Sequence, residues 1–246
     1  MESIINLLLG LHVSAGVISL ILFWIPVFVK KGKGLHAKVG RFYVYAMWTV
    51  VISAGILCVF NIFRDRMIMA AFLGVITVLT AHPLWYAITI LKYKREVPVR
   101  IINIRRALSW VLFLGSVGIT IWSIQLQLQG AAILLLIFGI IGIISSRPAF
   151  TSVAKAQASA NWLLDHLDGM IGTGIAAYTA FFAFGARSMM ADLFSEQLMV
   201  IPWVMPTIIG TIIIKVMKKR YSPKKTSTEQ KMQQTTDTKQ NIAQTA

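Results

Sequence analysis

The chain has 246 residues, of which 57% are hydrophobic and only 13% are charged, and its formal net charge is +15. A soluble domain usually carries about 25% charged residues, so this composition excludes an ordinary soluble globular protein. The basic excess alone would suit a nucleic-acid partner, but its distribution along the chain is typical of a membrane protein, and we expect no nucleic-acid binding.

Seven apolar stretches follow one another along the chain. An α-helix rises about 1.5 Å per residue, so stretches of about 17–26 residues are long enough to cross a hydrocarbon core of about 30 Å. The sequence therefore predicts an all-α, polytopic transmembrane bundle of about seven helices, contained in residues 1–220. In chain order, the predicted spans are residues 4–29, 42–63, 67–91, 107–127, 130–146, 160–185 and 197–217.

Three segments depart from this regular pattern. Residues 107–146 are almost continuously apolar and would form a helix of about 60 Å, twice the bilayer core, so we place an external turn at the polar residues 125–130. Residues 147–160 are mildly amphipathic, and they either lie along the inner surface or extend the sixth span. Residues 221–246 are rich in Thr, Gln and Lys, which predicts a disordered cytoplasmic tail.

The basic residues predict the orientation of the bundle. If the N-terminus lies outside, all but three of the 24 Lys and Arg residues fall in cytoplasmic segments, and the exceptions are Arg64, Arg66 and Arg187. This asymmetry predicts an odd number of spans with the C-terminus inside. We therefore expect a bacterial plasma-membrane protein whose partners are the bilayer and the anionic lipid head groups of its cytoplasmic face. The sequence indicates no protein partner.

Small residues in the sixth span predict close helix packing. Two adjacent faces of this helix carry them at four-residue spacing, which allows backbones to approach in lipid. We therefore expect the sixth span to lie at the centre of the bundle. The two faces are Gly169-x-x-x-Thr173-x-x-x-Ala177 and Gly172-x-x-x-Ala176-x-x-x-Ala180.

The four histidines are candidate functional residues because ionisable groups are costly inside a membrane. His12, His82 and His166 fall in the first, third and sixth predicted spans, and His36 falls in the first cytoplasmic loop. From the helix rise, His82 lies about 13 Å and His166 about 8 Å from the inner face, where His36 also lies, whereas His12 is about 26 Å away. We therefore expect His82, His166 and His36 to meet near the cytoplasmic side, without His12.

A polar stripe opens the sixth span, where Asn161, Asp165 and Asp168 share one helix face beside His166. One interpretation is a haem or metal site in which His is the ligand and Asp165 or Asp168 orients it. Another is a proton relay through His and Asp. A third is structural, with both carboxylates paired to Lys or Arg at the inner interface and Trp162 acting as an interfacial anchor.

The first loop and second span contain the pattern His36-x-x-x-Gly40-Arg41-x-Tyr43, preceded by His12. This pattern resembles a family of bacterial predicted multi-pass membrane proteins of unknown function. The resemblance covers mainly residues 10–50 and implies an architecture and candidate positions, including His12 and Arg41, but no activity. Arg41 and His36 would suit a lipid phosphate or a haem propionate, or would serve as topology anchors.

Three classes of function therefore stay open. A redox protein would hold haem b between His82 and His166 as axial ligands. A membrane-embedded zinc hydrolase acting on lipid would need His36 as a third ligand, with Asp165 or Asp168 as the base. The third class is a transporter or a non-enzymatic membrane scaffold.

Overall fold

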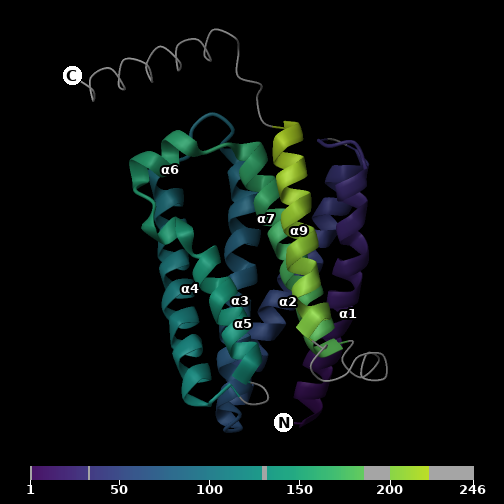
Figure 1. Cartoon of the computed structure of the whole chain (residues 1–246). Coiled ribbons are helices and arrows are strands. Elements are labelled where there is room, and N and C mark those ends of the chain that lie inside the picture. The colour runs from purple at the N-terminus through teal and green to yellow at the C-terminus, as the bar shows by residue number, and fades with distance from the viewer. Residues whose placement is uncertain (1, 33, 129–131, 186–199, 222–246) are drawn as a thin grey trace, which may run out of the picture.

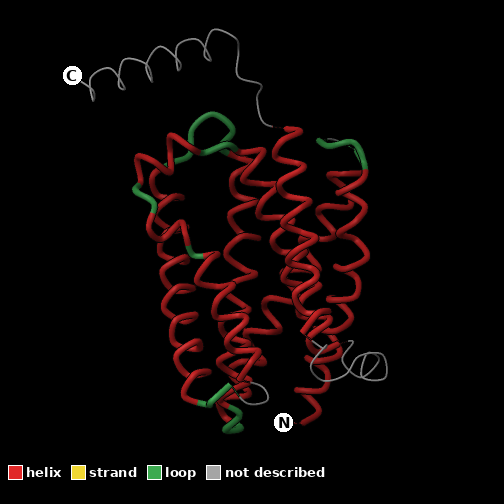
Figure 2. The backbone as a smooth tube through the Cα atoms, in the orientation of Figure 1, coloured by secondary structure: helices red, strands yellow, loops and turns green. Residues whose placement is uncertain are grey.

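The computed structural model describes residues 2–32, 34–128, 132–185 and 200–221, which form a bundle of helices (Figure 1). Figure 2 shows that the described backbone is helical apart from its connecting loops, and it contains no strand in these ranges. The all-α prediction is confirmed. The helices are α1 (Glu2–Phe28), α2 (Leu35–Phe63), α3 (Met67–Thr89), η1 (Ile90–Lys92), α4 (Val99–Gln125), α5 (Ala132–Ser145), η2 (Arg147–Phe150), α6 (Val153–Ser159), α7 (Trp162–Ala180), η3 (Phe181–Gly185) and α9 (Val200–Tyr221).

Six helical segments of the described chain are long and apolar enough to cross a membrane. They are Glu2–Phe28, Leu35–Phe63, Met67–Lys92, Val99–Gln125, Ala132–Phe150 and Trp162–Gly185. The chain is therefore a multi-pass membrane protein. The seventh predicted span is helical as α9 but is not among these six, so the count of seven stays a prediction.

Two helices begin earlier than their apolar stretches. The helix α2 begins at Leu35 and α4 at Val99, seven and eight residues before the predicted starts. Each predicted start was placed directly after the last basic residue. Long basic side chains can nevertheless belong to a helical turn, because they extend toward water. The prediction that His36 lies in a loop is consequently wrong, because His36 belongs to the first turn of α2.

The irregular segments divide as follows. The helix α4 ends at Gln125 and α5 begins at Ala132, on either side of the predicted turn at 125–130. Residues 129–130 of that turn lie outside the described ranges. Residues 147–160 form η2 and the separate short helix α6, which stops before α7 because Ala160 is extended. The predicted tail is also outside the described residues, apart from Tyr221, which ends α9.

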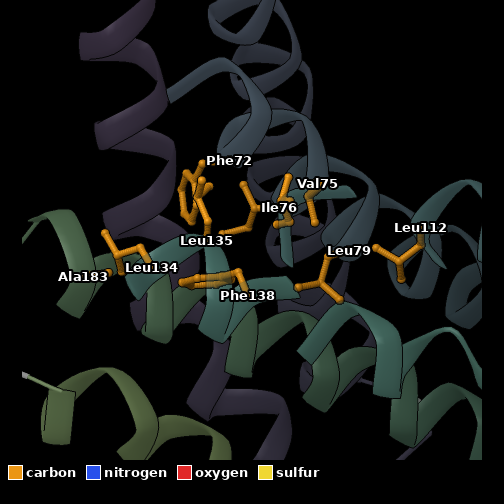
Figure 3. Close-up of a cluster of buried hydrophobic side chains, with 10 residues drawn as sticks. Phe72, Val75, Ile76, Leu79, Leu112, Leu134, Leu135, Phe138 and Ala183 are labelled. Atoms are coloured by element: carbon orange, nitrogen blue, oxygen red, sulfur yellow. The ribbon is translucent and has the colours of Figure 1, made fainter. Parts of the chain in front are cut away.

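Buried apolar side chains of α3, α4 and α5 form one core cluster, drawn in Figure 3. Phe72 of α3 meets Phe138 of α5 edge to face, with ring centroids 4.9 Å apart. A second cluster joins α1, α2, α3 and α7 and includes Phe23, Met47 and Leu84. Since α3 contributes to both clusters, it connects the two halves of the bundle.

The outer surfaces of α1 and α2 are also apolar, which distinguishes this bundle from a water-soluble one. Leu7 and Phe28 of α1 are 75% and 79% exposed, and Phe63 of α2 is 78% exposed. Large apolar side chains exposed along whole helices indicate contact with hydrocarbon rather than water.

The helix α7 packs against α1, α3 and α9. A β-carbon at Gly169 would lie 2.7 Å from the carbonyl oxygen of Pro83 in α3, so only glycine permits this approach. No atom outside its own helix neighbourhood lies within 4 Å of a β-carbon built at Gly172. The packing predicted from small residues is therefore present at Gly169 but absent at Gly172.

Candidate functional site

We call the end of the bundle that carries Lys30, Lys31, Arg105, Lys218 and Arg220 the cationic end. It includes the α1–α2 and α3–α4 connections and the last turn of α9. The beginning of α7 lies at the same end, and α6 covers part of it (Figure 1). His36 and His166 lie in the first two turns of helices that begin at this end, whereas His12 lies far from it along α1.

His166 lies in the second turn of α7. The side chain of Asn161 caps this helix by accepting hydrogen bonds from the backbone N–H groups of Leu163 and Leu164, at 3.1 and 3.2 Å. His166 Nδ1 is 2.9 Å from the carbonyl oxygen of Ala87, in the last turn of α3, where carbonyl groups lack regular helical partners. A carbonyl only accepts, so Nδ1 carries the hydrogen and Nε2 of the neutral ring keeps its lone pair.

His36 has the same arrangement in the first turn of α2. Its Nδ1 donates to the carbonyl oxygen of Pro26, near the end of α1, over 3.1 Å. This bond again fixes the tautomer with a free lone pair on Nε2. The imidazoles of His36 and His166 lie within electrostatic range of each other. His36 and His166 thus both lie at the cationic end, and the expected meeting of His36, His82 and His166 stays a prediction.

His82 is buried in α3 and is oriented differently. Its Nε2 lies 3.3 Å from Ser109 Oγ in α4, and the Ser109 hydroxyl donates to the carbonyl oxygen of Arg105 over 2.8 Å. Because that hydroxyl hydrogen is already used, Ser109 accepts from His82, whose Nε2 therefore carries the hydrogen. This tautomer does not offer the Nε2 lone pair that the predicted haem ligation by His82 requires.

His12 is separate from this region, as the sequence predicted. Its Nδ1 lies 2.9 Å from Ser53 Oγ of α2, and that hydroxyl donates to the carbonyl oxygen of Thr49 over 2.6 Å. His12 precedes Pro26 by about 21 Å of helix. It therefore serves as a hydrogen-bond contact between α1 and α2.

The two aspartates of α7 are held by cations and backbone. Asp168 forms an ion pair with Lys218 of α9. Asp165 accepts a hydrogen bond from the backbone N–H of Asn161 over 3.2 Å and interacts electrostatically with Arg105 of α4. Within the described ranges, neither carboxylate hydrogen-bonds to a histidine. The ion pair of Asp168 matches the structural interpretation of the polar stripe, whereas Asp165 forms no ion pair among the described residues.

Arg105 is a site residue that the sequence analysis did not single out. Its guanidinium carbon lies 3.8 Å from the centre of the Tyr86 ring, and its charge faces Asp165 and the His82 region. In the sequence it counted only as one of many cytoplasmic cations. The four-residue spacing from Arg105 to Ser109 places both on one face of α4, which could have marked that face as polar and inward.

The remaining candidates do not complete a metal site. In the part of the chain that the structure describes, no three His, Cys, Asp or Glu side chains are placed to hold one metal ion. The zinc site expected from His36, His82 and His166 is thus not formed there. Arg41 is exposed on α2.

Comparison of the chain with family models, with curated proteins and with solved structures finds no match. The resemblance of the first loop to multi-pass membrane proteins therefore stays a prediction, and the site is interpreted from its own chemistry.

Proposed function

We propose that this chain is a bacterial plasma-membrane protein that holds haem b or a metal ion through His36 and His166, near its cytoplasmic side, for a redox role. In this proposal the chain crosses the bilayer seven times, with α9 as the last span. The charge asymmetry of the sequence supports the orientation. The N-terminus and the end of α9 lie at opposite ends of the bundle (Figure 1), as an odd number of spans requires.

The observation that carries the cofactor proposal is the shared state of the two imidazoles. His36 and His166 come from different helices, and each donates Nδ1–H to a backbone carbonyl, at 3.1 and 2.9 Å. Metal-ligating histidines commonly use this bond, because it fixes the ring and leaves the Nε2 lone pair for the metal. His82, with its hydrogen on Nε2, is replaced by His36 in the proposed pair.

Two imidazole ligands fit haem better than zinc. Haem b takes two axial ligands from different helices, whereas catalytic zinc usually takes three protein ligands and a water. Bound haem would supply one-electron redox chemistry. The chain would contribute the two oriented rings, and Arg41, which follows His36 by five residues on α2, would suit a propionate.

The test is the absorbance spectrum and metal content of the full-length protein, purified in mild detergent from haem-replete cells. We expect a Soret band in the wild-type protein and its loss in His36→Ala and in His166→Ala. The same substitution at His12 is the matched control and should keep the band, as should His82→Ala. Thermal unfolding of each variant shows whether it is folded.

A colourless wild-type protein free of transition metals would refute the cofactor proposal. Equal loss of the band in His12→Ala would refute the assignment to His36 and His166.

One contact group favours transport as a second candidate. Arg105, Tyr86 and Asp165 come from three different helices and interact with one another. Ionisable groups that pair inside a membrane bundle often mark ion or proton pathways. A solute-flux assay in vesicles would show a loss of transport in Asp165→Asn if this candidate is correct, and unchanged flux would leave only a packing role for the group.

A further inference from the structure

A groove of about 560 Å³ lies at the cationic end, between the last turns of α1 and α9. The residues that line the groove come from the end of α1, the residues that follow it, and the C-terminal half of α9. Its wall is apolar and aromatic and includes Trp24 of α1 and Ile212 and Val216 of α9. Ile212 and Val216 are 55% and 60% exposed, so the wall continues onto the lipid-facing surface of α9.

The rim of the groove carries three cations, Lys30, Lys31 and Arg220, and none of the described residues that line it is acidic. The ion pairs of the described residues lie elsewhere and include none of these three. Partial burial and the nearby charge of Arg220 both lower the pKa of the Lys31 ammonium. Like charges held together without a counterion favour the binding of an anion between them.

Lys31 is fixed in position by the end of α1. Its Nζ donates to the carbonyl oxygens of Pro26 and Val27, each over 2.6 Å, and so caps the helix. An ammonium group has three hydrogens, so one stays available for a further acceptor. A fixed cation with a free donor, beside an apolar wall, is suited to a molecule with an anionic head and an apolar chain.

We infer that this groove binds an anionic glycerophospholipid, with its phosphate between Lys31 and Arg220 and an acyl chain along Ile212 and Val216. The inference rests on the proposed orientation, which places the cationic end in the cytoplasmic leaflet, and on the proposed association with anionic lipids. It does not depend on the histidine pair. A lipid satisfies both halves of the groove, because its charge complements the rim and its chain covers the exposed wall.

The chain's own C-terminal segment is the other occupant within reach, since residues 222–246 follow directly on Tyr221. That segment contains four lysines and only two acidic residues, so its net charge has the same sign as the rim. Charge complementarity therefore favours the lipid over this segment.

The test is lipid retention by the full-length protein, measured by native mass spectrometry in detergent with added phosphatidylglycerol or phosphatidylcholine. We expect wild-type protein to retain phosphatidylglycerol selectively. Lys31→Gln with Arg220→Gln should weaken its binding by about tenfold or more, since each cation near an anionic surface adds about 1 kcal/mol. Val216→Trp, which keeps every charge but fills the groove, should also weaken binding.

Lys155→Gln with Arg95→Gln is the matched control, because it removes one lysine and one arginine from exposed positions and should change binding less than about twofold. An equal loss in the control and groove variants would show general attraction to the face and overturn the site. If soluble glycerol phosphate competes for the groove as strongly as the lipid does, the proposed contribution of the acyl chain to binding would be overturned. If deletion of residues 222–246 alone restores binding to a non-binding protein, the segment is the occupant.

Orientation is tested separately, by the labelling experiment described in the Discussion. Selective retention in a protein whose cationic end faces outward would overturn only the assignment to the cytoplasmic leaflet. Absence of retention in a correctly oriented protein would overturn the groove while leaving the proposed topology intact.

Discussion

The four histidines of this chain differ most in which ring nitrogen carries the hydrogen. His36 and His166 donate from Nδ1 to carbonyl oxygens near helix ends, whereas His82 donates from Nε2 to a serine. The sequence could predict their positions along the helices, since position follows from helix rise. It could not predict the tautomers, because these depend on which carbonyl groups another helix leaves without partners.

At the residue scale, the first prediction concerns Gly169. Gly169→Ala places a methyl group 2.7 Å from the Pro83 carbonyl oxygen, a backbone atom that cannot rotate away. We expect a loss of about 1–3 kcal/mol in the free energy of unfolding, as for other overpacked contacts. Thermal unfolding in detergent should therefore show a lower midpoint.

Gly172→Ala is the control for this prediction, since no described atom of another helix lies within 4 Å of its β-carbon and alanine favours a helix by up to about 1 kcal/mol. Its midpoint should stay unchanged or rise. Equal destabilisation by both substitutions would mean that loss of glycine flexibility, and not contact with α3, determines the effect.

At the scale of elements, α9 contacts α7 near its C-terminal end and at its middle. Asp168 pairs with Lys218, and Gly210 lies against Ile175, leaving no space for a side chain. We expect Asp168→Asn and Lys218→Gln each to lower stability by less than about 1 kcal/mol, because both side chains are partly exposed. The double variant should lose less stability than the sum of the losses in the two single variants.

A double-mutant cycle of thermal midpoints measures that coupling, with Lys219→Gln replacing Lys218→Gln in the control cycle. Additive effects in the first cycle would argue against the ion pair between α7 and α9.

The spans and the connections were unequally predictable. Apolar length located the six described helices that are long and apolar enough to cross a membrane, because bilayer thickness sets the minimum length of a span. It placed the starts of α2 and α4 too late, because charged residues in their first turns do not interrupt helical hydrogen bonding. It also could not decide between a surface helix and an extension of α7 for residues 147–160, since that depends on the extended backbone of Ala160 and Asn161.

At the scale of the whole molecule, the orientation in the membrane can be tested by cysteine labelling. Cys58 is the only cysteine, so Cys58→Ser provides a background for Arg66→Cys and Lys155→Cys, which place thiols at opposite ends of the bundle. An impermeant maleimide added to intact cells should label position 66 and should label position 155 only after permeabilisation. The reverse pattern would refute the proposed orientation.

The candidate site shows how far sequence reasoning extends at this scale. Topology could place His36 and His166 at one end of the bundle, because each lies in a helix that begins after a connection at that end. The exclusion of His82 and the inclusion of Arg105 depend on the rotation of α3 and α4 about their axes. That rotation follows from side-chain packing across several helices, which no local pattern in one sequence determines.

A single backbone atom, the carbonyl oxygen of Pro26, accepts hydrogen bonds from both Lys31 and His36. The groove and the histidine pair thus share an anchor that no side-chain replacement at position 26 would delete. Scanning mutagenesis would detect this junction only through its two donors, and a tolerant result at Pro26 would not show that the junction is dispensable.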